Sequence, residues 1–228
     1  NAATWGLVVT GLLSEPSGQG LGAALTRLLA RAGEPVIRKA VDLMMRLLGE
    51  QFVCGETIEQ ALANSRAMED QGFRYSYDML GEAALTDADA LRYMEAYRRA
   101  IHAIGASGDF HGKDIFATPS ISVKLSALHP RYEHAKRARV LAELTPRLLE
   151  LARQARASGI GLTVDAEEAD RLELSLDVFA ATYLDPSLEG WEGCGLAVQA
   201  YQKRAPEVIT FVAELARQAG RRIPVRLV

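Results

Sequence analysis

The sequence predicts an α/β fold, a (β/α)8 barrel of the TIM type with about five strands inside this chain and a helical segment ahead of them. From Phe73 onward, short β-rich runs alternate with helical patterns of roughly 12–20 residues, which is typical of parallel strands joined by right-handed crossovers. Polar residues share one face of these strands, whereas parallel strands of an open sheet are apolar on both faces. An open doubly wound sheet is the competing architecture, and the absence of a G-x-G-x-x-G segment after any strand weakens its dinucleotide-binding version.

Residues 1–72 are predicted to form the helical lead-in. The segment 14–22 (SEPSGQGLG) is rich in turn formers and predicts a loop, and Glu34-Pro35 opens a helix whose apolar residues recur at helical spacing through residue 48. Thr57 followed by Gln60 indicates a capping box at the start of another helix, for which Gly72 is the expected stop. The inward residues of that helix are expected to be Ile58, Ala61, Leu62 and Met68.

Residues 73–228 are assigned to the barrel. The expected strands are 73–80, 120–126, 160–166, 195–201 and 223–228. The expected helices are one capped by Thr86 and Asp89, one over 135–157 that Pro146 kinks or restarts, one over 167–182, and one with Pro206 in its first turn. The inner face of the first barrel helix should include Leu91, Met94, Tyr97, Ile101 and Ile104.

Composition excludes several classes of function. With 26 basic and 29 acidic residues the net charge is −3, so no basic excess favours nucleic acid as a partner. Neither the two cysteines nor the four histidines have metal-ligand spacing, and no metal site is predicted. The apolar run 5–13 is too short to span a bilayer. Because the chain begins at Asn1 and stops inside an apolar run, we expect it to be part of a longer protein.

One functional side chain stands near the carboxyl end of each predicted strand: Asp78, Lys124, Asp165, Gln199 and Arg226. In a barrel those ends converge on one mouth, where active sites lie. Two carboxylates, an ammonium, a guanidinium and an amide suit a small zwitterion or a polar cofactor ring.

Each of these residues also has a purely structural interpretation. Lys124 and Asp165 can form an ion pair that caps the core, Gln199 can be a core amide, and Arg226 can face solvent. Asp78 can be a turn former, with Glu82 as an exposed loop charge. The acidic run after Asp165 suggests a metal site, but Glu167, Glu168 and Asp170 are expected at a helix start, where acids favour the dipole. His129 is expected to be a surface-loop histidine.

Five segments together resemble a known family: RYSYDMLGEAALT (74–86), SVKLSALHPRYE (122–133), VDAEEADRLE (164–173), QAYQKR (199–204) and RLV (226–228). They resemble the proline dehydrogenase domain of the bifunctional proline utilisation A flavoenzymes of bacteria, and GEPVIRKAVDLMMRLLGEQF (33–52) in the lead-in is similar as well. The resemblance implies a distorted (β/α)8 barrel that holds FAD and oxidises L-proline to 1-pyrroline-5-carboxylate by hydride transfer to the flavin. Electrons then pass to a membrane quinone.

By motif position, the resemblance also implies a role for each site residue. Lys124 would pair with the proline carboxylate, and Asp165 would be the active-site aspartate with Ala166 beside the flavin. Gln199 would hydrogen-bond the flavin ring, Arg226 would lie near flavin N5, and Val228 would make a backbone contact to the ring. Asp78 and Glu82 would be mouth residues, with the glutamate serving as a gate.

The resemblance further implies a cytoplasmic protein with transient peripheral contact to the inner membrane, and it is compatible with a homo-oligomer. The family's DNA-binding arm is expected elsewhere, so no nucleic acid is expected to bind this segment. The family continues past Val228 with more of the barrel, so this chain alone is not expected to bind proline and FAD fully.

Two other functions stay open on the residues alone. A Schiff-base aldolase is one of them, because a strand-end lysine such as Lys124 beside an aspartate fits that chemistry. The other is a non-catalytic fragment that serves as a scaffold or an assembly piece.

Overall fold

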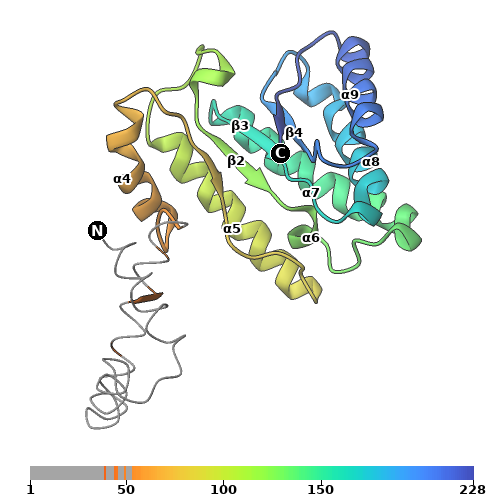
Figure 1. Cartoon of the computed structure of the whole chain (residues 1–228), viewed down its shortest axis with the longest axis horizontal. Helices are drawn as coiled ribbons and strands as arrows, with labels where there is room; N and C mark the ends of the chain where they lie inside the picture. Colours follow the sequence, from red (N-terminus) through yellow and green to blue (C-terminus); the bar gives the residue numbers. More distant parts are fainter. Residues whose placement is uncertain (1–38, 40–43, 46–48, 50–52) are drawn as a thin grey trace, which may run out of the picture. The chain divides into compact units, whose positions relative to one another are not determined.

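The computed structural model describes Lys39, Met44, Met45, Gly49 and residues 53–228, and the remaining residues are drawn in grey in Figure 1. The loop expected at 14–22 lies outside the described residues, and so does most of the helix expected from Glu34. The chain comprises two compact units, Asn1–Ala61 and Leu62–Val228, and the description below concerns the second.

Parallel strands alternate with helices throughout the larger unit. The strands are β1 (Ser76–Asp78), β2 (Ser120–Val123), β3 (Gly161–Val164), β4 (Cys194–Val198) and β5 (Val225–Leu227). The α-helices are α4 (Ile58–Glu69), which spans the unit boundary, α5 (Asp87–Ala106), α6 (Leu125–Leu128), α7 (Arg137–Ala157), α8 (Leu172–Tyr183) and α9 (Ala205–Ala219). Short 3-10 turns cover Ile115–Ala117, His134–Lys136, Ala169–Arg171 and Pro186–Leu188.

The five strands pair in parallel in the order β1-β2-β3-β4-β5, which is also their order in the sequence. Each crossover therefore steps in the same direction, and right-handed crossovers place all the connecting helices on one face of the sheet. Figure 1 shows α5, α7 and α8 along the sheet, and α5 packs on α7 and α7 on α8. A doubly wound sheet reverses direction and covers both faces with helices. The barrel topology is thereby confirmed and the doubly wound alternative is excluded.

The two faces of the sheet differ in chemistry, as the alternation of the strands predicted. Toward the helices, β1 to β4 present buried apolar side chains, namely Tyr77, Ile121, Val123, Leu162, Val164, Leu196 and Val198. These pack against fully buried residues such as Leu144, Leu148 and Leu151 of α7, each of which contributes roughly 1.5–3 kcal/mol by leaving water. The opposite, concave face carries Ser76, Ser122 and Thr163, and this face leads to the polar cluster described below.

Several element boundaries differ from the predictions. The second strand ends at Val123, and the residues expected to complete it form α6, since the Ala127 N–H donates back to the Lys124 carbonyl at 3.2 Å. The third barrel helix, α8, begins at Leu172 rather than at residue 167. Pro146 neither breaks nor restarts α7, which is continuous through it.

Two residues expected on inner helix faces are exposed. Leu91 of α5 is 60% exposed and Met68 of α4 is 37% exposed, so these two predictions were wrong. The other residues predicted on the inner face of α5, Met94, Tyr97, Ile101 and Ile104, are buried, whereas in α4 Ala61 is buried and Ile58 and Leu62 are half-buried. The capping box at the start of α5 is confirmed, because the Thr86 hydroxyl accepts from the Asp89 N–H and the Asp89 carboxylate accepts from the Thr86 N–H.

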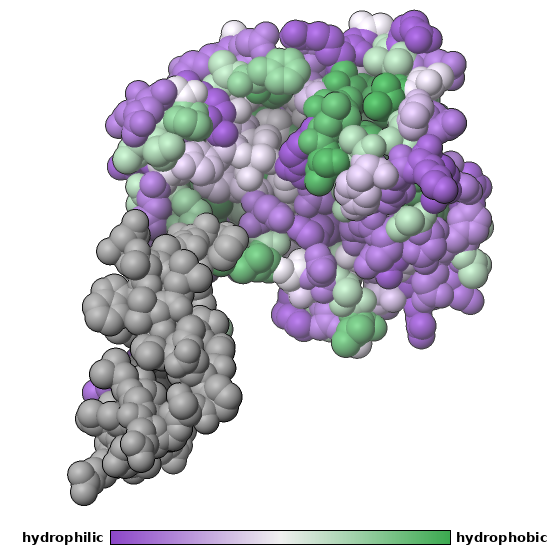
Figure 2. Space-filling view, in the orientation of Figure 1, coloured by the Kyte–Doolittle hydropathy of each residue, from purple (hydrophilic) through white to green (hydrophobic). Residues whose placement is uncertain are grey.

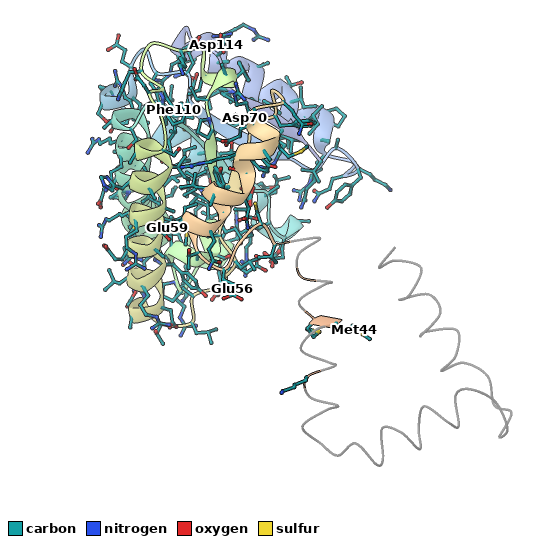
Figure 3. All side chains as sticks on the ribbon, turned by 90° about the vertical axis from the view of Figure 1, so that its left-hand side faces the viewer. Met44, Glu56, Glu59, Asp70, Phe110 and Asp114 are labelled. Carbon is teal, nitrogen blue, oxygen red and sulfur yellow. The ribbon has the colours of Figure 1, made fainter. Side chains whose placement is uncertain are left out.

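The amino ends of the strands face the α5–β2 connection and line a cavity of about 200 Å³, to which Ser76, Ser120 and Gly161 contribute. Figure 3 shows Phe110 and Asp114, in the α5–β2 connection, at the same end of the unit as Asp70, which follows α4. Gly159, just before β3, has a φ of +69°, and a Cβ there would lie 3.2 Å from the Phe110 carbonyl carbon. The charged side chains gather at the opposite, carboxyl ends of the strands, where the candidate site is described below. None of the described helices is long and apolar enough to cross a bilayer.

Candidate active site

Four charged side chains meet where the strands end. The Lys124 Nζ lies 2.8 Å from both carboxylate oxygens of Asp78 and 3.1 Å from Oδ2 of Asp165. The other oxygen of Asp165, Oδ1, accepts from Arg226 Nη2. Asp165 thus bridges the two cations, and four of the five residues predicted at the strand ends form one connected network.

The backbone around Lys124 is held by two partners far away in the sequence. The Lys124 N–H donates to the hydroxyl of Tyr97 in α5 at 3.1 Å, and the Ser126 N–H donates to the Glu167 carboxylate at 3.0 Å. Lys124 is also the residue that precedes the first turn of α6. A strand end, a helix start and two buried acceptors therefore fix where the lysine side chain leaves the backbone.

Arg226 reaches back across the concave face from β5. Its Nη1 donates to the Ser122 Oγ of β2 at 3.0 Å and lies 3.5 Å from the Ser76 Oγ of β1. Because β5 is not a neighbour of β1 or β2 in the sheet, these contacts require the sheet to curl around its concave face. That curvature is what a barrel needs.

The charges of this cluster balance, with two carboxylates against two cations. Partial burial by itself lowers the pKa of Lys124, but the hydrogen bonds to Asp78 and Asp165 outweigh it, so the pKa lies above its ordinary value. Lys124 therefore stays an ammonium at neutral pH. Burial raises the pKa of Tyr97 to about 12, which keeps its hydroxyl neutral beside the network.

Three further candidates, Gln199, Ala166 and Val228, are not bonded to this network. Gln199 follows β4, is half-buried and accepts a hydrogen bond from the Gln202 side-chain amide. Ala166 and Gln199 line the same cavity, between the β3–α8 and β4–α9 connections. The Val228 N–H donates to Val198 and its carbonyl accepts from Ala200, so the β4–β5 pairing already uses both backbone groups.

Glu82 also lies outside the network. It is exposed in the β1–α5 connection and makes no hydrogen bond or ion pair with any described residue. It lies between Gly81, with a φ of +119°, and Ala83, whose φ of +56° is uncommon for a residue with a Cβ. The Ser126 hydroxyl accepts from the Ala83 N–H at 3.2 Å and holds this connection to α6.

Sequence reasoning missed three contributors and misplaced two others. Ser122, Tyr97 and Ser126 were interpreted only as strand or packing residues, and no local pattern distinguishes them. Glu167 does not lie at a helix start; it is largely buried in the β3–α8 connection, and that burial raises the pKa of its carboxyl group.

The prediction for His129 was also wrong. Its side chain is buried, its Nε2 lies 2.9 Å from the Glu143 carboxylate, and its Nδ1 accepts from the Arg131 N–H. Within the described part of the chain, no group of three metal-ligating side chains comes together.

Family comparisons cover both parts of the chain. The family model described as proline dehydrogenase matches residues 61–228, and the model described as the DNA-binding domain of proline dehydrogenase matches residues 1–52. The second match conflicts with the expectation that no nucleic acid binds this segment, which was based on the net charge and on placing the family's DNA-binding arm elsewhere.

Similar curated proteins are the bifunctional protein PutA of Salmonella typhimurium, 57% identical, and that of Escherichia coli K12, 56% identical, each over 100% of this chain. This chain spans 17% of the length of those relatives. The proline dehydrogenase of Deinococcus radiodurans is 25% identical over 78% of this chain and 52% of its own.

Solved structures agree with the fold. A proline utilization A (PutA) protein is 57% identical with a TM-score of 0.73, covering 89% of this chain and 20% of that one. The Bdellovibrio bacteriovorus PutA, inactivated by N-propargylglycine, is 23% identical with a TM-score of 0.79 over 85% of this chain and 21% of its own, a likeness of fold. The curled sheet, the network at its carboxyl edge and the match over residues 61–228 lead to one conclusion: the chain belongs to the proline dehydrogenase family.

Proposed function

We propose that this chain supplies the first part of an active site that oxidises L-proline to 1-pyrroline-5-carboxylate, with FAD as the hydride acceptor and a membrane quinone as the next electron acceptor. The observation that carries the proposal is the network of Asp78, Lys124, Asp165 and Arg226 at the carboxyl edge of the sheet, in a chain of this family. Residues 73–228 would then be the amino-terminal part of the barrel.

The chemistry of the donors supports a flavin at this edge. The ring of a flavin presents both hydrogen-bond donors and acceptors, and Gln199 offers both through one amide. Arg226 has a side chain 42% exposed, so part of its guanidinium is accessible to a ligand although two of its nitrogens have protein partners. Ala166 would lie beside the ring, and Val228 would contribute the second lone pair of its carbonyl. FAD, when bound, supplies the capacity to accept a hydride.

The residues of this chain would bind and orient the substrate. The Lys124 ammonium is fixed from both sides of its backbone, so it can hold a substrate carboxylate in one orientation. Asp78 is the more exposed of its two partners, 46% against 11% for Asp165, and is the one that a substrate carboxylate would displace. Asp165 would keep Lys124 and Arg226 in place during that exchange, while Glu82 would act at the mouth as a gate. Arg226 would stabilise negative charge that develops near it.

The aldolase alternative is disfavoured by the same geometry. A Schiff-base lysine needs an unprotonated amine, which proteins obtain by lowering its pKa through burial or a neighbouring cation. Lys124 has the opposite surroundings, with three carboxylate oxygens within 3.1 Å and a pKa above its ordinary value.

A second function is proposed for residues 1–52 because they match the DNA-binding domain model. We infer that this segment binds duplex DNA in the protein that carries it. A gel-shift titration of that protein with and without residues 1–52 tests the inference, and equal affinity of the two forms would reject it.

The proposed electron transfer to a membrane quinone would require a cytoplasmic protein to make transient contact with the inner membrane. A homo-oligomer is compatible with this contact.

The proposed oxidation is tested by spectroscopy on the protein at its natural length. We expect a flavin absorbance spectrum that bleaches when L-proline is added without oxygen, and that returns when a soluble quinone is added. A preparation that takes up no FAD, or a bound flavin that L-proline leaves oxidised, would overturn the proposal and favour a non-catalytic role.

A further inference from the structure

A buried hydroxyl lies beneath the charged network. Ser122 is 1% exposed, in the middle of β2, between the fully buried Ile121 and Val123 of the opposite face. Its register partners are Asp78 on β1 and Thr163 on β3, which places it on the concave face. A hydroxyl without a hydrogen bond is costly at such a position, so its partners are informative.

The Ser122 hydroxyl has two side-chain partners on this face. Its Oγ accepts from Arg226 Nη1 at 3.0 Å and lies 3.1 Å from the Ser76 Oγ, to which it can donate its single proton. Arg226 comes from β5, 104 residues further along the chain. The contact therefore depends on the curvature of the sheet rather than on local structure.

Two acceptors hold the guanidinium through two different nitrogens. Nη2 donates to Asp165 of β3, and Nη1 donates to Ser122 of β2. A planar guanidinium held through one nitrogen can still rotate about that bond, whereas contacts through two nitrogens to two strands fix its plane. Asp165 alone would keep the charge nearby without fixing its orientation.

From this geometry we propose that Ser122 is a positioning residue for proline oxidation, which orients the Arg226 guanidinium toward the flavin. The inference rests on the proposed function. Ser122 would act through Arg226, with which its hydroxyl forms a hydrogen bond. A preorganised cation stabilises the charge of the reduced ring without rearranging during the reaction. Loss of the hydroxyl should therefore lower the flavin midpoint potential and kcat together and spare the affinity for proline, because the contacts of Lys124 are unchanged.

The alternative is that Ser122 is only a small residue that fits the interior. Two isosteric variants separate these roles: Ser122→Thr keeps the hydroxyl, and Ser122→Val replaces it with a methyl group of the same shape. Both add the same bulk, so a packing defect affects them equally. Ser76→Ala is the matched control in the same layer, because the Ser76 Oγ lies further from Arg226, at 3.5 Å.

The experiment is spectroelectrochemistry of the bound flavin, with steady-state kinetics, on the protein at its natural length. We expect the valine variant to have a midpoint potential about 30 mV more negative than the threonine variant, the two-electron equivalent of a tenfold change. Its kcat should be about tenfold lower, with KM for L-proline within about twofold. Ser76→Ala should show a smaller shift.

Equal potentials and equal kcat for the threonine and valine variants would overturn the inference, and so would a valine variant whose defect lies only in KM. These outcomes differ from failure of the proposed function. If L-proline does not reduce the flavin of the wild-type protein, the proposed function fails; if it does and the isosteric pair agree, only the role of Ser122 fails.

Discussion

The Lys124 ammonium is the most constrained group at the residue scale. Three carboxylate oxygens from two neighbouring strands surround it, and its own backbone is held by Tyr97. Such a lysine is a poor nucleophile and a good fixed cation, because its proton is stabilised while its position is set. The structure therefore favours a role in recognising a carboxylate over a role in covalent catalysis.

Lys124→Met tests that role. Methionine keeps most of the stem but offers no donor, so the substrate carboxylate loses a charge-assisted hydrogen bond, which contributes about 1.5–3 kcal/mol. We expect KM for L-proline to rise roughly 10- to 100-fold in steady-state kinetics. Lys113→Met, at an exposed lysine in the α5–β2 connection, is the control and should change nothing. An unchanged KM in the Lys124 variant would remove the lysine from substrate recognition.

Glu167 gives a prediction about pH. Burial raises the pKa of this carboxyl group, and the Ser126 N–H and the Arg171 guanidinium offset the effect only in part, while Glu168 adds to it. The folded protein therefore holds this proton more tightly than the unfolded chain. The resulting stabilisation is complete below the ordinary pKa of glutamic acid and is lost as pH rises through the higher, folded-state value.

Glu167→Gln should consequently raise the melting temperature at pH 7.5 and leave it unchanged near pH 4. Glutamine keeps an oxygen that can accept from the Ser126 N–H, and it carries no charge to bury. Thermal unfolding at both pH values measures the difference, with Glu168→Gln, at a neighbouring glutamate whose side chain is 63% exposed, as the control. A Glu167→Gln protein less stable than wild type at pH 7.5 would show that the charge itself stabilises the loop.

The sequence predicted some of these residues and could not predict others, for a physical reason. Asp78, Lys124, Asp165 and Arg226 follow from one rule, that parallel strands end at a common edge. Tyr97 and Ser122 contribute through contacts to residues 27 and 104 positions away, which exist only after α5 has packed on β2 and the sheet has curled, respectively. The spacing of residues within one element does not predict such contacts. From the sequence, Tyr97 is therefore predicted only to pack on the inner face of its helix.

At the scale of elements, burial decides how much each helical residue contributes to stability. The helical pattern predicted which elements are helices and most of their inner faces, but it placed Leu91 inward when it is 60% exposed. An apolar residue at the margin of a helical stripe satisfies the periodicity on either side. Whether such a residue is buried depends on how far the neighbouring element extends over the helix, and the periodicity of the sequence does not predict this.

Two leucine-to-alanine changes make this difference measurable. Leu148 of α7 is fully buried, and Leu148→Ala should lower the free energy of unfolding by about 2–5 kcal/mol through lost burial and a residual cavity. Leu91→Ala, the same chemical change on α5, should stay within about 0.5 kcal/mol of wild type. Urea titration followed by circular dichroism measures both. Similar losses in the two variants would mean that the exposed face of α5 is covered in solution.

Strand ends were the least predictable elements. The segment 120–126 alternates polar and apolar residues throughout, yet β2 stops at Val123 and α6 follows directly. Three acceptors outside the strand hold this turn: the Tyr97 hydroxyl, the Glu167 carboxylate and the Lys124 carbonyl. Tertiary hydrogen bonds here override a local β pattern, and the interruption is what directs Lys124 into the site.

At the scale of the whole molecule, the order of the strands explains why the two faces of the sheet differ in chemistry. Strands added in sequence order bring all crossovers to one side, so the other face is free to be polar and to curl around a site. The alternation of elements predicted this architecture. The alternation does not show how strongly the sheet curls. That curvature, which brings Arg226 of β5 within 3.5 Å of Ser76 of β1, is seen only in the structure.

The outer face of β5 is the least covered part of this architecture. Val225 and Leu227 are 42% and 61% exposed, whereas the equivalent faces of β2, β3 and β4 are buried under helices. Figure 2 shows hydrophobic side chains gathered in a patch on the face viewed there. Among the described strands β5 pairs only with β4, which leaves its second edge free to pair. An apolar edge strand of this kind promotes association between copies.

We therefore expect the 228-residue chain to self-associate in a concentration-dependent manner when it is prepared by itself. Leu227→Lys should reduce that association, because a charge on the exposed strand opposes pairing with another copy. Leu91→Lys is the matched control, since Leu91 has nearly the same exposure, 60%, but lies on α5. Sedimentation velocity over a range of concentrations measures the effect. If the wild-type chain stays monomeric, or if both lysine variants weaken association equally, β5 is not the associating surface.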